Sequence, residues 1–167
     1  MTTNLEPQWI LGFTDGEGCF NVSIVRQKSM AMGFQVLADY TVVQHERDIQ
    51  ILHALKDYFG VGQVGRNNDT RQHYRVRGLQ PLTEAIIPFF EKHQLKTKKR
   101  IDFIKFRRIQ LMVQRGQHLT PQGLLLIDKI RQKINRGPKT YLKLEEDGTV
   151  EMYDHATNEI HVARKRK

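Results

Sequence analysis

The chain has 167 residues, and 27 Lys and Arg against 18 Asp and Glu give it a formal net charge of +9. This length fits one domain with room for a small appendage, and the basic charge favours a polyanionic partner without identifying it. The single cysteine, Cys19, excludes a disulfide framework and a cysteine-rich zinc module, and no apolar run could span a bilayer, so we expect no membrane partner. Residues 1–7 contain neither a basic leader nor an apolar core, so we expect a chain that begins as a mature soluble protein.

The first predicted element is a helix that begins near Pro7 and ends at Gly16 or Gly18. Gly12 and Gly16 lie four residues apart and therefore share one helix face. A helical glycine costs about 0.5–1 kcal/mol relative to alanine, so we interpret this stripe as a place where another backbone approaches closely. Asp15 and Glu17 fall in the last turn, where the helix dipole disfavours negative charge and a bound cation would offset the penalty.

Two strands with a period of two follow the helix, over residues 19–25 and 34–44, and a flexible loop at 27–33 joins them. The residues predicted to face inward are Phe20, Val22, Ile24, Val36, Ala38, Tyr40 and Val42. Apolar residues spaced three and four apart then predict an amphipathic helix over 46–59, which Gly60 ends. A second hairpin follows over 62–77, around an Asx-rich turn at 68–71.

Three further helices are predicted over 79–91, 96–115 and about 120–133. The candidate core positions of the second of these are Ile101, Ile104, Phe106, Ile109 and Leu111. This order of elements gives an α+β fold with a four-stranded antiparallel sheet packed under helices. We expect a domain over 1–136 and an extension over 137–167, made either of short strands at 141–144, 149–153 and 159–162 or of a partly disordered arm ending in the basic run 164–167.

The stretch Ile10-Leu11-Gly12-Phe13-Thr14-Asp15-Gly16-Glu17-Gly18 resembles the motif of LAGLIDADG homing endonucleases. It matches the two spaced glycines, the first and last acids and the closing glycine, although Glu17 stands where the family name has Asp. The resemblance extends over roughly residues 9–133 and is closest to the branch with one motif per chain. It implies an αββαββα fold and a homodimer whose contact is formed by Ile10, Gly12, Phe13, Asp15 and Gly16.

The resemblance also implies site residues. Glu17, with Gly16, would bind Mg²⁺ or Mn²⁺ shared between two Glu17 carboxylates; Gln44 would organise water; and Lys96 resembles the active-site lysine of the family. Asp15 sits two residues earlier, and its expected role is structural, as a cap or a hydrogen-bonding group across a helix pair. The seven histidines show no metal-ligand spacing, so we expect them to be surface or core residues.

Strand parity predicts which polar side chains are available to double-stranded DNA. A two-stranded ribbon fits the major groove, where Arg pairs with guanine and Asn or Gln with adenine. With neighbouring loop and helix positions, the predicted DNA-binding residues are Asn21, Ser23, Gln27, Lys28, Gln35, Asp39, Thr41, Arg66, Asn67, Arg71, His73, Arg75, Arg77, Lys98 and Lys99.

The leading hypothesis is a homodimeric, metal-dependent endonuclease that makes a double-strand break in a long, nearly palindromic DNA target. The alternative is an intron maturase, for which the partner would be RNA, or a catalytically silent DNA-binding regulator on the same fold. Either function places the protein inside a cell at nucleic acid, in an organelle (chloroplast or mitochondrion) or in prokaryotic cytoplasm. The set Glu17, Gln44 and Lys96 favours the nuclease.

Overall fold

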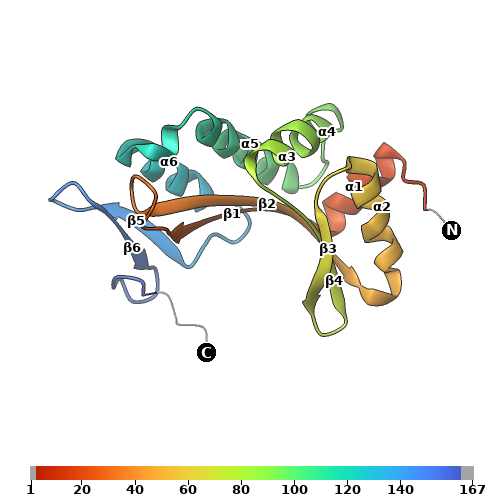
Figure 1. Cartoon of the computed structure of the whole chain (residues 1–167), viewed down its shortest axis with the longest axis horizontal. Helices are drawn as coiled ribbons and strands as arrows, with labels where there is room; N and C mark the ends of the chain where they lie inside the picture. The colour runs from red at the N-terminus through yellow and green to blue at the C-terminus, as the bar shows by residue number, and fades with distance from the viewer. Residues whose placement is uncertain (1–2, 163–167) are drawn as a thin grey trace.

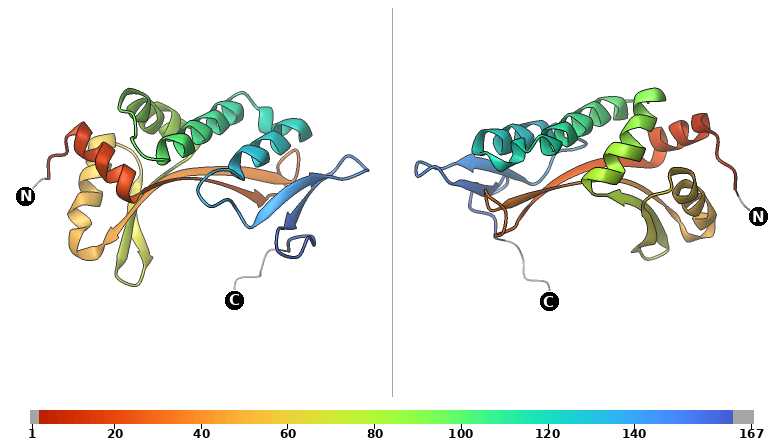
Figure 2. Two further views of the ribbon diagram at one scale, coloured as in Figure 1. Left: turned by 180° about the vertical axis from the view of Figure 1, so that it is seen from behind. Right: turned by 45° about the horizontal axis from the view of Figure 1, so that its top comes forward.

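The computed structural model describes residues 3–162 as a curved sheet with helices over one face (Figure 1). Its strands are β1 (Gly18–Arg26), β2 (Phe34–His45), β3 (Gln63–Asn68) and β4 (Arg71–Arg77). They are ordered β1-β2-β4-β3, and every neighbouring pair is antiparallel. The two further views show the green and teal helices over β1 and β2, and the β3–β4 hairpin turned away from them with the helix over residues 49–59 beside it (Figure 2). The predicted α+β class and four-stranded antiparallel sheet are confirmed.

The first helix, α1 (Pro7–Glu17), leads directly into β1 at Gly18. It buries Ile10, Leu11 and Thr14 against the sheet, and the hydroxyl groups of Thr14 and Tyr40 are 2.7 Å apart in the core. This hydrogen bond satisfies two buried hydroxyl groups and fixes the rotation of α1 over β2. Pro7 stands at the start of the helix, as predicted.

An aromatic cluster around Phe20 of β1 joins the sheet to the helices. Its ring centroid lies 5.2–5.3 Å from those of Tyr40, Phe90, Phe103 and Phe106. Such pairs add about 0.5–1.5 kcal/mol each beyond the area that they bury. The inward residues predicted for β1 are all buried, which confirms its parity.

The next helix, α2 (Ile49–Phe59), follows a 3-10 turn and ends at Gly60, whose φ of 67° is left-handed. The helical stretch from Leu79 to Lys92 consists of α3 (Leu79–Pro81), a π-helical segment (Leu82–Ile86) and α4 (Ile87–Lys92). Pro88 has no N–H to donate to the fourth residue before it, which is a physical reason why regular α-helix is interrupted here.

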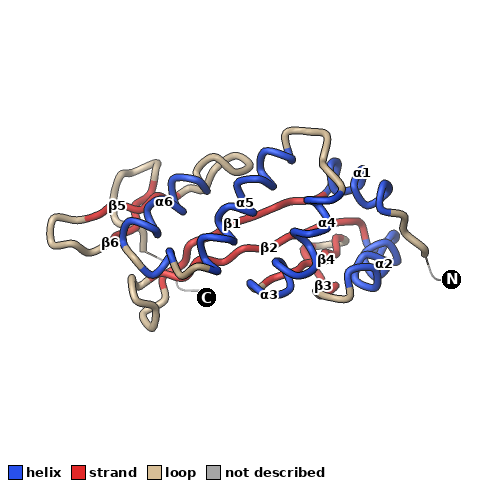
Figure 3. Tube along the Cα trace, turned by 90° about the horizontal axis from the view of Figure 1, so that it is seen from above, coloured by secondary structure: helices blue, strands red, loops and turns tan. Residues whose placement is uncertain are grey.

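The long helix α5 (Lys99–Gln114) lies along the sheet beside α6 (Figure 3). The prediction that Ile101 and Ile104 are core residues was wrong, because their exposed fractions are 52% and 54%. The sequence contains two apolar stripes, and the buried one includes Phe103 and Phe106, whose rings pack on Phe20. The helix also begins at Lys99, later than predicted, because residues 96–98 form a turn.

The last helix, α6 (Pro121–Arg131), is capped by Thr120, whose hydroxyl accepts a hydrogen bond from the Gly123 N–H. A hairpin of β5 (Thr140–Leu144) and β6 (Val150–Asp154) follows, so the extension contains the short strands that were one of its two expected forms. The expected strand at 159–162 was wrong, since that segment forms only one isolated bridge, between Tyr153 and Ile160.

The C-terminal hairpin is tied to α6 through a buried ion pair. Arg131 Nε donates to Asp128 Oδ1 at 2.7 Å, and Asp128 Oδ2 accepts a hydrogen bond from Leu142 N at 2.9 Å. The two charges are therefore paired and further hydrogen-bonded, as buried ions must be. The basic run 164–167 lies outside the described residues. None of the helices over residues 3–162 is long and apolar enough to cross a membrane.

Candidate functional site

The tip of α1 presents Glu17 to solvent. Among residues 3–162 the Glu17 carboxylate has no hydrogen-bond or ion-pair partner, and the side chain is exposed. Packing explains why glycine follows Glu17. A Cβ on Gly18 would lie 2.7 Å from Thr14 Cγ2, so no larger residue fits where the helix meets the strand. The motif therefore ends in a tight turn that leaves Glu17 pointing away from the chain's own polar groups.

Asp15 has the structural role that we expected, but its observed partners lie in the same chain. Its carboxylate accepts hydrogen bonds from Lys96 N at 2.8 Å, Thr97 N at 3.2 Å and Thr97 Oγ1 at 2.7 Å. Partial burial opposes ionisation, but these hydrogen bonds and the Lys99 ammonium outweigh it and hold the pKa of Asp15 below its ordinary value. Asp15 thus fastens the turn before α5 to the end of α1, and its predicted place in a dimer contact stays a prediction.

The fold brings Gln44 and Lys96 to the same end of the sheet as Glu17. Val42 of β2 pairs with Gly18, so Gln44, two residues further along, lies beside the point where α1 meets β1. Lys96 is brought there because Asp15 binds its N–H, and its side chain is exposed. Gln44 has the strand parity of buried Val42, so it belongs to the side of the sheet that carries α1.

The two lysines after Lys96 are bound within the chain. Lys98 Nζ donates to Asp102 at 3.1 Å, and Lys99 Nζ donates to the Thr14 carbonyl at 3.0 Å. Lys99 thereby places a positive charge at the C-terminal end of α1, where the helix dipole favours it. The predicted contact of Lys99 with DNA stays a prediction beside this capping contact, and the Lys98 side chain is 64% exposed.

The glycine stripe of α1 is open. A Cβ at Gly12 or Gly16 would meet nothing within 4 Å, so packing inside the described chain does not explain either glycine. Phe13 is half-buried and stacks on Trp9 at 4.6 Å, and Trp9 itself is 41% exposed. Ile10 was wrongly assigned to this surface, since it is fully buried in the chain's own core. The prediction from the sequence did not include Trp9 in this surface, although Trp9 precedes Gly12 and Gly16 at helical spacing.

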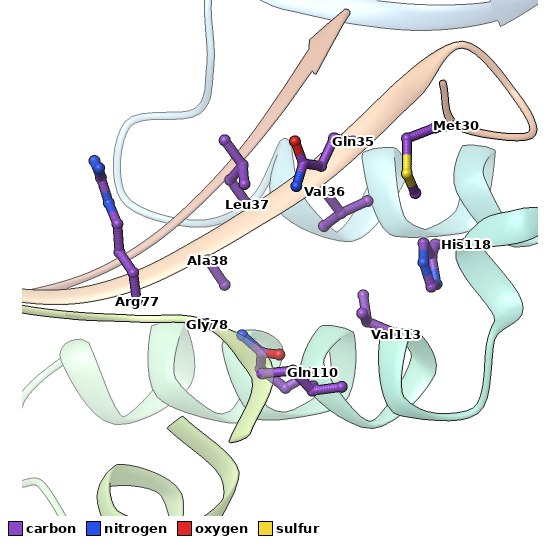
Figure 4. Close-up of a pocket in the computed structure, with 11 residues that line it drawn as sticks. Met30, Gln35, Val36, Leu37, Ala38, Arg77, Gly78, Gln110, Val113 and His118 are labelled. Carbon is purple, nitrogen blue, oxygen red and sulfur yellow. The ribbon is translucent and has the colours of Figure 1, made fainter. Parts of the chain in front are cut away.

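The outer face of the sheet, meaning the face opposite the helices, carries the predicted polar side chains of β1, β2 and β4. Figure 4 shows Gln35, Leu37 and Arg77 on the side of β2 away from α5. Two assignments on this face were wrong: Asp39 and Thr41 are each only 7% exposed, because polar neighbours from β4 enclose them.

The β3–β4 hairpin extends the outer face. His73 pairs with Gly65 on β3 and with Val43 on β2. Its pKa is lowered, mainly by burial and further by the positive charges of Arg75 and Arg77. Its Nδ1 is buried and has no partner in the described structure. Arg66 pairs with Gln72 and so has the opposite parity, which corrects its assignment to the outer face. Asn21, Ser23, Gln27, Lys28, Asn67 and Arg71 remain predicted DNA contacts.

A cavity of about 250 Å³ lies on the other side of β2, between the strand and α5 (Figure 4). Its lining is mostly apolar and includes Val36, Ala38 and Val113. The polar groups in the lining are Gln35, Arg77, Gln110 and His118. It contains no carboxylate and lies away from the tip of α1, so we do not assign chemistry to it. Within residues 3–162, no group of three or more His, Cys, Asp or Glu side chains is placed to hold a metal ion.

Comparison with known proteins matches this geometry. Residues 10–110 match the family model described as LAGLIDADG endonuclease. The chain is similar to the homing endonuclease I-TnaI, with 49% identity, a TM-score of 0.79 and coverage of 81% of this chain and 92% of that one. It is also similar to I-SmaMI bound to cleaved DNA, with 31% identity, a TM-score of 0.79 and coverage of 82% and 46%. Another I-SmaMI structure is described as bound to an uncleaved DNA target in the presence of calcium ions.

Among curated relatives, Probable intron-encoded endonuclease 2 of Neurospora crassa is 34% identical over 141 residues, which cover 83% of this chain and 31% of that protein. The chain spans less than a third of the length of the first curated relatives that it matches. The helix with its acidic tip, the polar outer face of the sheet and these matches together define one class of protein. The chain belongs to the LAGLIDADG endonuclease family.

Proposed function

We propose that this chain is a divalent-metal-dependent endonuclease that cuts double-stranded DNA at a specific site as a homodimer. The observation that carries the proposal is the exposed, unpartnered Glu17 carboxylate at the tip of α1, with Gln44 and Lys96 at the same end of the sheet. Family membership and the DNA named with I-SmaMI support the choice of substrate.

The donor set at the tip fits a hard divalent cation. Glu17 has no competing partner among the described residues, and the Gly16 carbonyl belongs to the last helical turn, whose carbonyls lack intrahelical donors. Carboxylate and carbonyl oxygens are the ligands that Mg²⁺ and Mn²⁺ prefer. When bound, such an ion supplies charge neutralisation at the scissile phosphate and the leaving oxygen and favours formation of the attacking hydroxide.

The remaining chemistry falls to side chains of the chain itself. The Gln44 amide can donate and accept hydrogen bonds, so it would orient the attacking water. The Lys96 ammonium is a compact, mobile charge that would stabilise negative charge developing on the phosphate. Arginine side chains of the outer face would bind and orient the duplex beneath the tip. Different parts of the chain would then position the DNA and break its phosphodiester bond.

The open glycine stripe supports the proposed homodimer. One Glu17 per chain provides one of the two carboxylates that a double-strand break requires, and two α1 helices crossing at Gly12 and Gly16 would bring two such tips together. Two-fold symmetry of the protein would then call for a nearly palindromic target. We further propose that the protein acts inside a cell at DNA, in an organelle or prokaryotic cytoplasm; relatives named after ND4 and cox1 introns support an intron-associated role.

The test is incubation with a plasmid library carrying randomised inserts, first with Mg²⁺ and then with Ca²⁺. We expect linear product from a restricted set of inserts with Mg²⁺, and DNA binding without cleavage with Ca²⁺. Sedimentation with DNA present should show two chains per duplex. Tight binding to structured RNA without DNA cleavage would overturn the proposal in favour of a maturase, and one chain per cleaved duplex would overturn the homodimer.

A further inference from the structure

A connected polar network crosses from β2 to β4 on the outer face. Thr41 pairs directly with Arg75, and Asp39 pairs directly with Arg77. Thr41 and Asp39 are buried although none of the described helices covers this face (Figure 1), so neighbouring side chains enclose them. Burying polar groups such as these costs free energy, and a surface that only needs to be solvated does not require it.

The hydrogen bonds in the network run in one direction. Arg75 Nε donates to Thr41 Oγ1 at 3.0 Å, and the Thr41 hydroxyl, having one hydrogen, donates it to Asp39 Oδ1 at 2.7 Å. The other carboxylate oxygen, Asp39 Oδ2, lies 3.9 Å from Arg77 Nε, so it attracts that guanidinium as an ion pair. Both arginines are therefore approached at Nε, and among residues 3–162 their terminal nitrogens have no partner.

Resting on the proposed function, we propose that Thr41 and Asp39 are positioning residues for DNA recognition. By holding Arg75 and Arg77 at Nε, they turn the paired terminal nitrogens of each guanidinium outward. This edge matches the O6 and N7 acceptors of guanine in the major groove. A free arginine loses rotamer freedom when its side chain is fixed, so an arginine held before binding loses less when DNA arrives.

The spacing predicts the pattern that is read. Two residues along a strand span roughly 6.6–6.8 Å, and base pairs are stacked about 3.4 Å apart. Arg75 and Arg77 would therefore read guanines about two base-pair steps apart in each half-site. The arginines also line a polar hollow on this face with Gly62, Gln63 and His73, which leaves room for a base edge beside them.

Thr41→Val is the most direct test, because valine has the shape of threonine and removes the acceptor for Arg75 Nε. Wild type and variant are each offered a selected target and a panel in which every base pair is changed in turn, in buffer with Ca²⁺. We expect discrimination of about 5- to 150-fold at the base pair read by Arg75 to fall to less than about 3-fold. Preference at distant base pairs should not change, and Thr41→Ser should retain the wild-type profile.

Thr149→Val is a matched control. The Thr149 hydroxyl also donates to a carboxylate two residues earlier, Asp147 Oδ1, at the same 2.7 Å, but in the C-terminal hairpin. It should leave the base-preference profile unchanged. In the same way, Asp39→Asn should weaken preference at the base pairs read by both arginines, whereas Asp147→Asn should not.

Arg75→Lys keeps the positive charge and leaves Thr41 unchanged. It should reproduce the Thr41→Val profile, with overall affinity within about 3-fold of wild type. An unchanged profile in folded Thr41→Val would overturn the inference, as would equal weakening on every target. If Thr41→Val does not fold, Asp39→Asn decides by the same criterion at the base pairs read by the two arginines. Absence of any preferred sequence in wild type would instead refute the proposed function, which is a separate result.

Discussion

The tip of α1 and the outer face of the sheet are built from opposite charges. At the tip, the Glu17 carboxylate stands without a partner, next to helix carbonyls. On the outer face, Arg75 and Arg77 are held by a buried threonine and a buried carboxylate. The tip repels a phosphate unless a cation is present, while the face attracts phosphates and base edges at all times.

This difference teaches that binding and bond breaking should be separable. Interactions that are equally strong in the ground and transition states give affinity, whereas only those that strengthen in the transition state give rate. Under the proposed function, the outer face would supply the first kind and the tip the second. Changes at the tip should therefore alter rate before affinity, and changes on the face should do the reverse.

Glu17→Gln should have the largest effect. It keeps the size of the side chain and removes the charge that would hold a divalent cation, so we expect the cleavage rate to fall by about three orders of magnitude or more. Affinity in metal-free buffer should stay level or rise, because a carboxylate near phosphate is removed. Single-turnover cleavage and equilibrium binding on one target measure the two quantities. Glu146→Gln, at an exposed position of the C-terminal hairpin, is the control, and a fully active Glu17→Gln enzyme would remove Glu17 from the site.

Gly12→Ala tests whether the tip needs a second copy. Alanine favours a helix by about 0.5–1 kcal/mol over glycine, and a Cβ at this position meets nothing inside the chain, so the isolated chain should become more stable. Dimerisation should nevertheless weaken by about 10-fold or more, because the added methyl group blocks close backbone approach. Thermal melts at low concentration would show the gain in stability, and sedimentation would show the loss of dimerisation. Gln50→Ala on α2 should leave dimerisation unchanged, and a Gly12→Ala chain that dimerises normally would place the interface elsewhere.

The sequence was sufficient for features with a local cause. Alternating apolar residues predicted the inward face of β1. The close backbone approach predicted at Gly12 and Gly16 is not supplied by the described chain and stays a prediction. Proline predicted where α1 begins, and glycine predicted where α2 ends. The catalytic set Glu17, Gln44 and Lys96 came from the family resemblance, and its roles stay predictions.

Features that depend on distant partners could not be predicted. Asp15 binds Lys96 and Thr97, which are about eighty residues away along the chain. Thr41 and Asp39 looked like exposed residues because their burial depends on the β2–β4 register. Both apolar stripes of α5 have helical spacing, so the sequence does not show which one is buried. Packing against Phe20 buries the stripe with Phe103 and Phe106.

Asp15→Asn should affect folding before chemistry, in contrast to Glu17→Gln. Asn keeps one acceptor but loses the charge that strengthens three hydrogen bonds, so we expect a loss of about 1–2 kcal/mol in the free energy of unfolding at pH 7. The pKa of Asp15 is lowered in the folded state, so its stabilisation is present above the unfolded pKa and is lost as pH falls below about 4. The difference between wild type and variant should therefore shrink in acid. Urea unfolding at pH 7 and pH 3 measures it, and a variant with normal stability but no cleavage would give Asp15 a catalytic role instead.

Arg71→Ala should have the smallest effect and should test the outer face as a phosphate-binding surface. Arg71 is exposed at the turn of the β3–β4 hairpin and has no partner among the described residues, so its guanidinium is free for a phosphate. Each neutralised phosphate contributes a slope of about −0.9 to the plot of log affinity against log salt, so the variant should lose about one unit of slope. Its base preferences should not change, because a phosphate contact carries no sequence information. Arg108→Ala removes the same charge from the exposed face of α5, on the far side of the sheet, and should leave the slope nearly unaltered. Equal slopes for the two variants would mean that DNA does not lie along this face, and altered base preference in Arg71→Ala would make Arg71 a reader of sequence rather than a phosphate contact.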